Sequence, residues 1–110
     1  MASSDLTQAP VVVLAPQQTV FEVGGRGGPW RVERGLVRLD RIGRDGPLLV
    51  MLAEPGDWLG LDALAGQTHG WRATAITPVT VRGPLQPVHD GERARWLTEA
   101  LLQQPERAHA

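Results

Sequence analysis

Glycine and proline divide most of this chain into segments that are long enough for β-strands and too short for helices. The sequence contains 13 glycines and nine prolines, and short apolar runs lie between them. Glycine supplies the positive φ of tight turns, and proline cannot donate to a strand ladder, so both residues end strands. Short strands at close, regular spacing with glycine turns predict a β-sandwich or β-roll.

The expected strands are residues 11–14, 19–23, 30–33, 36–42, 48–52, 71–77 and 79–82. A turn is expected at residues 24–29, and the Asp-Gly pair in residues 43–46 predicts a hairpin, because both residue types tolerate positive φ. The two-residue period of a strand puts Val37 and Leu39 on one face. The continuous apolar run 48–52 predicts the most buried strand of the fold.

Residues 54–66 form the centre of the pattern. They read Glu-Pro-Gly-Asp-Trp-Leu-Gly-Leu-Asp-Ala-Leu-Ala-Gly, which predicts a Pro-Gly turn, a short strand and one helical turn over residues 61–65. Backbone N–H groups at such a turn attract an anion if they face the inside of a roll. The alternative is a tight turn that only packs the core, and Asp62 would alternatively cap the helical turn.

The last part of the chain predicts a helix. Asp90 is a suitable N-cap, and Glu92 in the first turn favours the helix dipole. The apolar stripe expected to face the roll consists of Ala94, Leu97 and Leu101, with Ala100 beside it. Pro105 is expected to end the helix.

Composition excludes several classes of protein. An apolar fraction of 42% with 21% charged residues is typical of a folded soluble protein, and a net charge of −1 gives no general attraction to nucleic acid or membranes. The absence of cysteine excludes disulfides and thiolate metal sites. The N-terminus has no signal-peptide pattern, and no apolar run approaches the roughly 18 residues of a membrane span. We therefore expect a cytoplasmic protein.

Catalytic and metal-binding patterns are missing. His69, His89 and His109 lie far apart, and no His-x-His pair suits a metal. Ser3 and Ser4 are the only serines and lie in the expected tail, and no two carboxylates form an obvious acid–base pair. We expect no metal, no cofactor and no enzymatic activity.

The order of these pieces resembles the cyclic-nucleotide-binding-like β-roll of the cAMP receptor/fumarate-nitrate regulator (CRP/FNR) superfamily. The matching segments are residues 30–39, 45–46, 55–60 and 73–75, and the resemblance extends over roughly residues 18–103. It implies a mainly β fold, an antiparallel double-stranded β-helix (jelly roll) with a C-terminal helix, and a homodimer that regulates transcription. Residues 71–79 look most like the corresponding strand of NtcA-type nitrogen regulators, which sense 2-oxoglutarate.

The resemblance also identifies where a ligand would bind. Nucleotide binders of the family carry Gly-Glu in the central turn, where the glutamate takes the ribose hydroxyl. Here the turn reads Gly60-Leu61-Asp62, so an apolar residue holds the glutamate position. This difference predicts that the chain does not bind cAMP or cGMP.

The following strand differs as well. The family carries Arg-Ser/Thr-Ala there, and alignment through Ala73 and Thr74 puts Trp71 at the phosphate arginine and Arg72 at the hydroxyl residue. If the alignment is shifted by one residue, Arg72 takes the position of the phosphate arginine, but the hydroxyl residue is lost. Arg72 is then either a clasp for a carboxylate or phosphate, or a strand residue that points to solvent.

The candidate ligand-binding residues are Gly60, Leu61, Asp62, Trp71, Arg72 and Thr74. They predict a ligand-sensing regulatory domain with a degenerate nucleotide cassette, whose ligand is a small anionic metabolite such as 2-oxoglutarate. The alternative is a ligand-free module that retains the roll and binds another protein.

The expected organisation is a flexible tail at residues 1–9, a sensor-like roll at 10–88, and a helix with the truncated start of a dimerisation helix at 89–110. Full-length family members continue into a helix-turn-helix, and no recognition helix follows here, so we expect no direct DNA binding. A homodimer or a protein partner would use the C-terminal helix. Trp30 and Trp58 occupy positions of core aromatics in the family, whereas Trp96 either covers the roll or is an exposed anchor.

Overall fold

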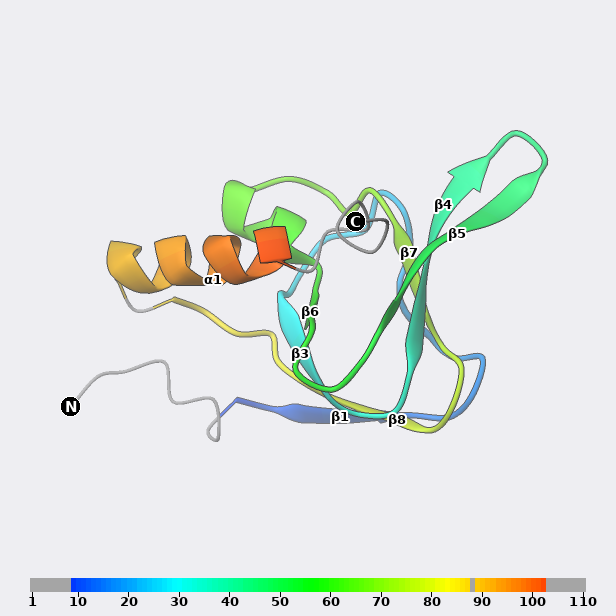
Figure 1. Cartoon of the computed structure of the whole chain (residues 1–110), viewed down its shortest axis with the longest axis horizontal. Helices are drawn as coiled ribbons and strands as arrows, with labels where there is room; N and C mark the ends of the chain where they lie inside the picture. The colour runs from blue at the N-terminus through cyan, green and yellow to red at the C-terminus, as the bar shows by residue number, and fades with distance from the viewer. Residues whose placement is uncertain (1–8, 88, 103–110) are drawn as a thin grey trace.

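The chain folds as two four-stranded antiparallel sheets and one α-helix (Figure 1). The computed structural model describes residues 9–87 and 89–102. The first sheet contains, in spatial order, β1 (Val11–Leu14), β8 (Val79–Arg82), β3 (Trp30–Arg34) and β6 (Trp58–Leu59). The second contains β2 (Thr19–Phe21), β7 (Arg72–Ala75), β4 (Val37–Gly43) and β5 (Gly46–Ala53). The predicted jelly roll with a C-terminal helix is confirmed.

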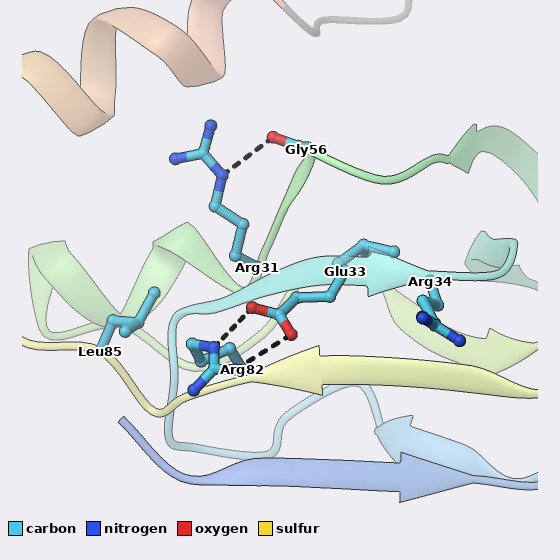
Figure 2. Close-up of a pocket in the computed structure, with 7 residues that line it drawn as sticks. Arg31, Glu33, Arg34, Gly56, Arg82 and Leu85 are labelled. Carbon is cyan, nitrogen blue, oxygen red and sulfur yellow. Dashed lines mark hydrogen bonds and ion pairs between the residues drawn. The ribbon is translucent and has the colours of Figure 1, made fainter. Parts of the chain in front are cut away.

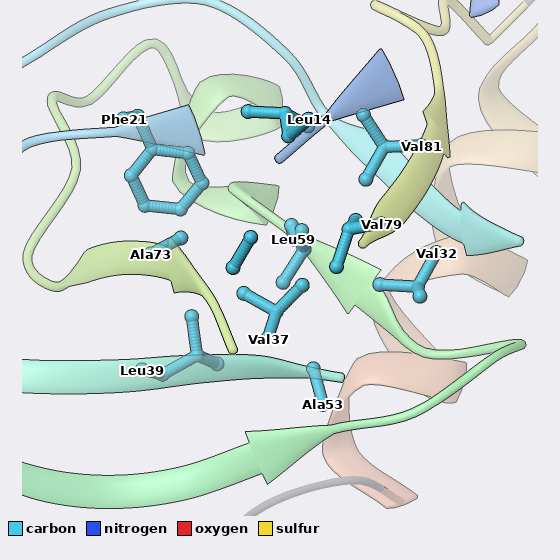
Figure 3. Packing of buried hydrophobic residues seen from close by; sticks show 11 residues of the cluster. Leu14, Phe21, Val32, Val37, Leu39, Ala53, Leu59, Ala73, Val79 and Val81 are labelled. Atoms are coloured by element: carbon cyan, nitrogen blue, oxygen red, sulfur yellow. The ribbon is translucent and has the colours of Figure 1, made fainter. Parts of the chain in front are cut away.

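The main core lies between the two sheets (Figure 3). Burial alternates along β7 and β8, as the two-residue period requires, and Val37 and Leu39, which were predicted to share a face, are both buried. The other buried members of this cluster are Leu14, Phe21, Val32, Ala53, Leu59, Ala73, Ala75, Val79 and Val81. Burial of each valine or larger apolar side chain contributes about 1.5–3 kcal/mol, which makes this layer the main source of stability.

The hairpin of β4 and β5 corrects one prediction. Its turn lies at residues 43–46 as expected, but the run 48–52 is not the most buried strand. Leu48 and Leu49 are 51% and 54% exposed, and Leu52 is 45% exposed. The physical reason is position, because β5 is an edge strand and the hairpin extends beyond the rest of the roll (Figure 1).

Two strands are shorter than expected. β2 ends at Phe21 and β7 begins at Arg72, because the backbone beyond these ends pairs elsewhere. The N–H of Gly24 donates to the carbonyl of His69 at 2.8 Å, and the N–H of His69 donates to the carbonyl of Gly25 at 2.9 Å. These bonds hold the glycine-rich loop after β2 against the segment before β7.

Helix α1 (Asp90–Leu102) presents a different face from the one predicted. Glu92 and Trp96 are buried, whereas Ala94 is exposed and Leu97 is 42% exposed. The helix is turned so that its largest apolar side chain is buried, instead of the narrower stripe of alanine and leucine. The expected contributions of Ala100, Leu101 and Pro105 lie outside the described side chains.

The N-terminus of α1 is capped by a residue that the sequence did not indicate. The helix begins at Asp90 as expected, but the N–H of Glu92 donates to Nδ1 of His89 at 3.1 Å. The capping side chain is therefore that of His89, and the prediction of Asp90 as N-cap is wrong.

A second, smaller cluster attaches the helix to the roll. It consists of Trp58, Leu64, Leu85 and Trp96. The rings of Trp58 and Trp96 lie 4.8 Å apart between centroids, a separation typical of favourable aromatic pairs. Trp96 thus covers the roll and is not an exposed anchor.

Two glycines test how tightly the strand connections pack. Gly35 and Gly24 have similar φ of 88° and 84°, but a Cβ at Gly35 would lie 2.1 Å from the carbonyl oxygen of Pro78, whereas none of the described atoms lies within 4 Å of one at Gly24. Gly24→Ala should cost about 1–2 kcal/mol from backbone strain alone. Gly35→Ala should cost about 2–5 kcal/mol, because overpacking is added. Urea unfolding measures both, and equal costs would contradict the packing described here.

Candidate functional site

The turn after β6 forms as the sequence predicted. A single 3-10 turn, η2 (Leu61–Ala65), follows Gly60, whose φ of 75° and ψ of 32° are left-handed. A Cβ at Gly60 would lie 2.9 Å from Cε1 of His69 and 3.2 Å from the ring of Trp30. The position therefore requires glycine, because two aromatic rings lie directly against the backbone.

The inside of the roll beside Gly60 is occupied by rings. Phe21 stacks on His69 with centroids 3.9 Å apart, and Trp30 lies 5.6 Å from Phe21 and 5.9 Å from His69. The side chain of His69 is fully buried. The predicted anion cradle thus faces aromatic side chains of the chain itself.

The side chain of His69 is held by packing, whereas its backbone makes hydrogen bonds with Gly24 and Gly25. Neither ring nitrogen makes a hydrogen bond, and Nδ1 lies 3.8 Å from Oδ2 of Asp62, which is beyond hydrogen-bonding distance. That Oδ2 accepts a bond from the N–H of Gly70 at 3.2 Å. Since η2 has no side-chain cap, the alternative role of Asp62 as a cap is wrong.

Arg72 and Thr74 lie on the other face of β7. Their neighbours Ala73 and Ala75 are buried in the core, so alternation directs the two polar residues outward. Arg72 is paired in register with Asp40 of β4. Nε of Arg72 is buried without a hydrogen-bond partner, although the residue as a whole is half-buried.

Asp40 on this outer face is itself buried and strongly bound. It is 1% exposed and accepts hydrogen bonds from Nε and NH2 of Arg38 at 2.8–3.1 Å. A two-residue spacing on one strand brings these side chains to the same face. The pair places one fixed carboxylate beside Arg72.

The other two candidates have separate environments. Trp71 packs half-buried against the main core, and Leu61 packs against the cluster under α1. The six predicted residues therefore occupy the ring-filled interior, the helix contact and the outer face of the second sheet. Their joint role in binding a ligand stays a prediction.

A polar clasp joins the first sheet to α1. Nε1 of Trp58 donates to Oε1 of Glu99 at 2.9 Å, and NH1 of Arg31 lies 3.1 Å from the same oxygen. The guanidinium of Arg31 also lies 4.6 Å from the centroid of the Trp58 ring. In addition, NH1 of Arg93 on α1 donates to the carbonyl of Leu64 in η2. Sequence reasoning missed the clasp because its members lie on separate elements.

A hollow of about 490 Å³ lies on the outer face of the first sheet (Figure 2). Its lining residues are Arg31, Val32, Glu33, Arg34, Gly56, Arg82 and Leu85. Nε and NH2 of Arg82 both donate to the carboxylate of Glu33, the second at 3.2 Å. NH1 of Arg82 donates to the carbonyl of Ala9 at 3.0 Å. The alternation of Arg31 and Glu33 is the sequence signal for this face.

Within residues 9–87 and 89–102, no three histidine, aspartate or glutamate side chains gather to hold a metal ion. In the same residues, no helix is long and apolar enough to cross a membrane.

Comparison of the sequence with curated proteins finds transcriptional regulators. LdrP of Thermus thermophilus is 33% identical over 82 residues, which cover 74% of this chain and 42% of that protein. SdrP of the same organism is 37% identical over 81 residues, covering 73% of this chain and 40% of SdrP. The chain thus spans less than half the length of these relatives. No protein-family model matches the chain.

Solved structures share the fold. TTHA1359, a CRP/FNR-family transcriptional regulator of Thermus thermophilus, superimposes with a TM-score of 0.72 at 28% identity, covering 91% of this chain and 55% of that one. TTHB099, a CRP-family regulator of the same organism, superimposes with a TM-score of 0.74 at 28% identity, covering 89% of this chain and 51% of that one. The sensor domain of DNR from Pseudomonas aeruginosa superimposes with a TM-score of 0.65 at 15% identity, covering 96% of this chain and 69% of that one. At this identity the similarity shows a shared fold alone.

The pair of Glu33 and Arg82 predicts a pH dependence. The hydrogen bond from Arg82 is the main cause that holds the pKa of Glu33 below its ordinary value of 4.5. A carboxylate with a lowered pKa stabilises the fold above its unfolded-state pKa, and the contribution disappears as the pH falls through the folded-state pKa.

Glu33→Gln should therefore lower stability at neutral pH, by less than about 1 kcal/mol for this exposed pair. The deficit should vanish in acid. Denaturant unfolding at several pH values measures this deficit. A deficit of Glu33→Gln that stays constant down to strongly acidic pH would contradict the assignment.

Proposed function

Because the chain is a cyclic-nucleotide-binding-like β-roll of the CRP/FNR superfamily, we propose that it is a regulatory domain that works without a cyclic nucleotide. In this proposal it acts in transcription regulation through contacts with other proteins. LdrP and SdrP are transcriptional regulators, and the chain spans about two fifths of each. Because the chain covers only part of each regulator, its role in transcription regulation is itself part of the proposal.

One observation carries this proposal. Beside Gly60, where the resemblance puts a nucleotide, the rings of Trp30 and His69 lie against the backbone. By the resemblance, Leu61 takes the position of the ribose glutamate, and in the alignment through Ala73 and Thr74 Trp71 takes that of the phosphate arginine. A cyclic phosphate brought there would lose its hydration and meet aromatic carbon instead of a guanidinium, which is costly for a charged group.

The outer face of α1 supports a protein contact. Ala94 and Leu97 are exposed there, and an apolar helix face of this kind suits a second copy of the chain or another protein. A homodimer or a partner bound through α1 is therefore part of the proposal. The role requires no covalent chemistry, and the relation to transcriptional regulators supports a cytoplasmic location.

A second candidate function is the sensing of a small anionic metabolite at Arg72. The observation in its favour is the buried Nε of Arg72, which has no hydrogen-bond partner, since buried donors normally find an acceptor. A carboxylate such as that of 2-oxoglutarate would supply one, with the hydroxyl of Thr74 on the same face. Asp40 beside it opposes a second carboxylate, which makes this candidate weaker.

Thermal unfolding with ligands tests the main proposal. Millimolar cAMP or cGMP should leave the melting temperature unchanged, because the described side chains beside Gly60 are aromatic rings and include no guanidinium. A ligand present at a hundred times its Kd would add about 2.7 kcal/mol, or more than about 10 °C for a domain of this size. A saturable rise with either nucleotide would contradict the proposal.

Variants of Arg72 test the second candidate. If 2-oxoglutarate raises the melting temperature, Arg72→Ala should abolish that rise, whereas the exposed Arg41→Ala on the same sheet should keep it. A rise that survives in Arg72→Ala would exclude this site. Calorimetric titration of both variants provides the matching affinities.

A further inference from the structure

Two arginines face each other across strands on the outer face of the first sheet. Arg31 of β3 and Arg82 of β8 are partners in register, while the adjacent pair Val32 and Val81 faces the core. Like charges directly opposite each other destabilise a sheet. Positions at which a sequence breaks a local rule are those where function is to be expected.

A β-bulge brings a third arginine to the same place. The ladder passes from the pair Val32 and Val81 to the pair Arg34 and Thr80, so Glu33 is the additional residue. A bulge redirects the side chains around it. Glu33 and Arg34 consequently both line the hollow that contains Arg31 (Figure 2).

The hollow already holds carboxylates and retains a positive charge. Glu33 binds Arg82 through two donors, and Glu99 of α1 binds Arg31. The guanidinium of Arg34 makes no hydrogen bond or ion pair with another described residue, whereas its backbone pairs with Thr80. Among the described residues, three guanidinium groups thus face two carboxylates, and planar paired donors of this kind recognise carboxylates specifically.

The shape of the hollow indicates the source of a further carboxylate. Sites for small molecules enclose most of their ligand, whereas this hollow opens to solvent along the sheet surface. A protein segment suits it better, because the partner supplies the missing cover. Leu85 adds an apolar contact to the arginine rim.

We propose that the outer hollow beside β3 and β8 binds an acidic segment of a partner protein, with glutamate or aspartate side chains on its arginines. This inference names the partner chemistry for the protein contacts of the proposed function and in that respect rests on it. Arg34 is the main unpaired contact, and Glu33 competes with the incoming carboxylate.

The test uses the full chain and a fluorescein-labelled peptide of alternating glutamate and leucine. Fluorescence anisotropy at low salt should show saturable binding, which added salt weakens. The same peptide with glutamine in place of glutamate should not bind. Absence of binding by the acidic peptide, or equal binding by both peptides, would overturn the proposal.

Three variants locate the binding. Arg34→Gln should lower the affinity for the peptide by about two- to fivefold, which is the effect of one exposed charge. Glu33→Gln should strengthen it, because a competing carboxylate is removed. Arg44→Gln, in the turn of the β4–β5 hairpin, carries the same charge change and should bind like the unaltered chain. Equal weakening by Arg44→Gln and Arg34→Gln would reduce the result to general charge attraction and overturn the site.

A free dicarboxylate is the alternative source of the same chemistry. Displacement of the peptide by millimolar succinate would overturn the assignment to a protein segment, whereas persistence of the complex supports it. The experiment is independent of the ligand test above. If the peptide does not bind, the proposal that the domain works without a cyclic nucleotide still stands. If cAMP shifts the melting temperature, a positive result of the peptide test still stands.

Discussion

Close packing of aromatic rings against Gly60 decides how the inside of this β-roll is used. A glycine without a side chain lets Trp30 and His69 approach the backbone at the point where the strand enters η2. Phe21 then stacks on His69 and continues the layer into the main core. The same contacts that complete the core therefore also occupy the space beside the turn.

The helix is connected to this interior through a short series of contacts. Trp96 packs on Trp58, which belongs to the strand that leads into the turn. Glu99 binds both Trp58 and Arg31, while Leu64 of η2 lies in the same cluster as Trp96. The helix, the turn and the first sheet thus form one packed unit, and Ala94 and Leu97 of α1 stay exposed.

The sequence predicted what depends on local pattern. The positions of most strands along the chain, the hairpin at residues 43–46 and the helical turn after Gly60 all follow from turn residues and alternation. The burial of 48–52 was misjudged because an apolar run does not reveal that its strand lies at an edge. The helix face was misjudged because one tryptophan outweighs a stripe of smaller residues, and its partner Trp58 is distant in sequence.

The candidate site was less predictable than the fold. Alternation correctly offered an outward Arg72 as one alternative, but only the register places it beside Asp40. Nothing near His69 in the sequence indicates that it stacks on Phe21, since the contact joins separate segments. The cross-strand arginines were equally hidden, because their opposition depends on the pairing of β3 with β8.

Aromatic side chains of the chain itself occupy the roll beside Gly60. Nuclear Overhauser contacts of the His69 imidazole in the unliganded chain measure this most directly. Strong contacts are expected from its ring protons to the rings of Phe21 and Trp30, unchanged when cAMP is added. Absence of these contacts, with the imidazole protons exposed to solvent or displaced by cAMP, would contradict it.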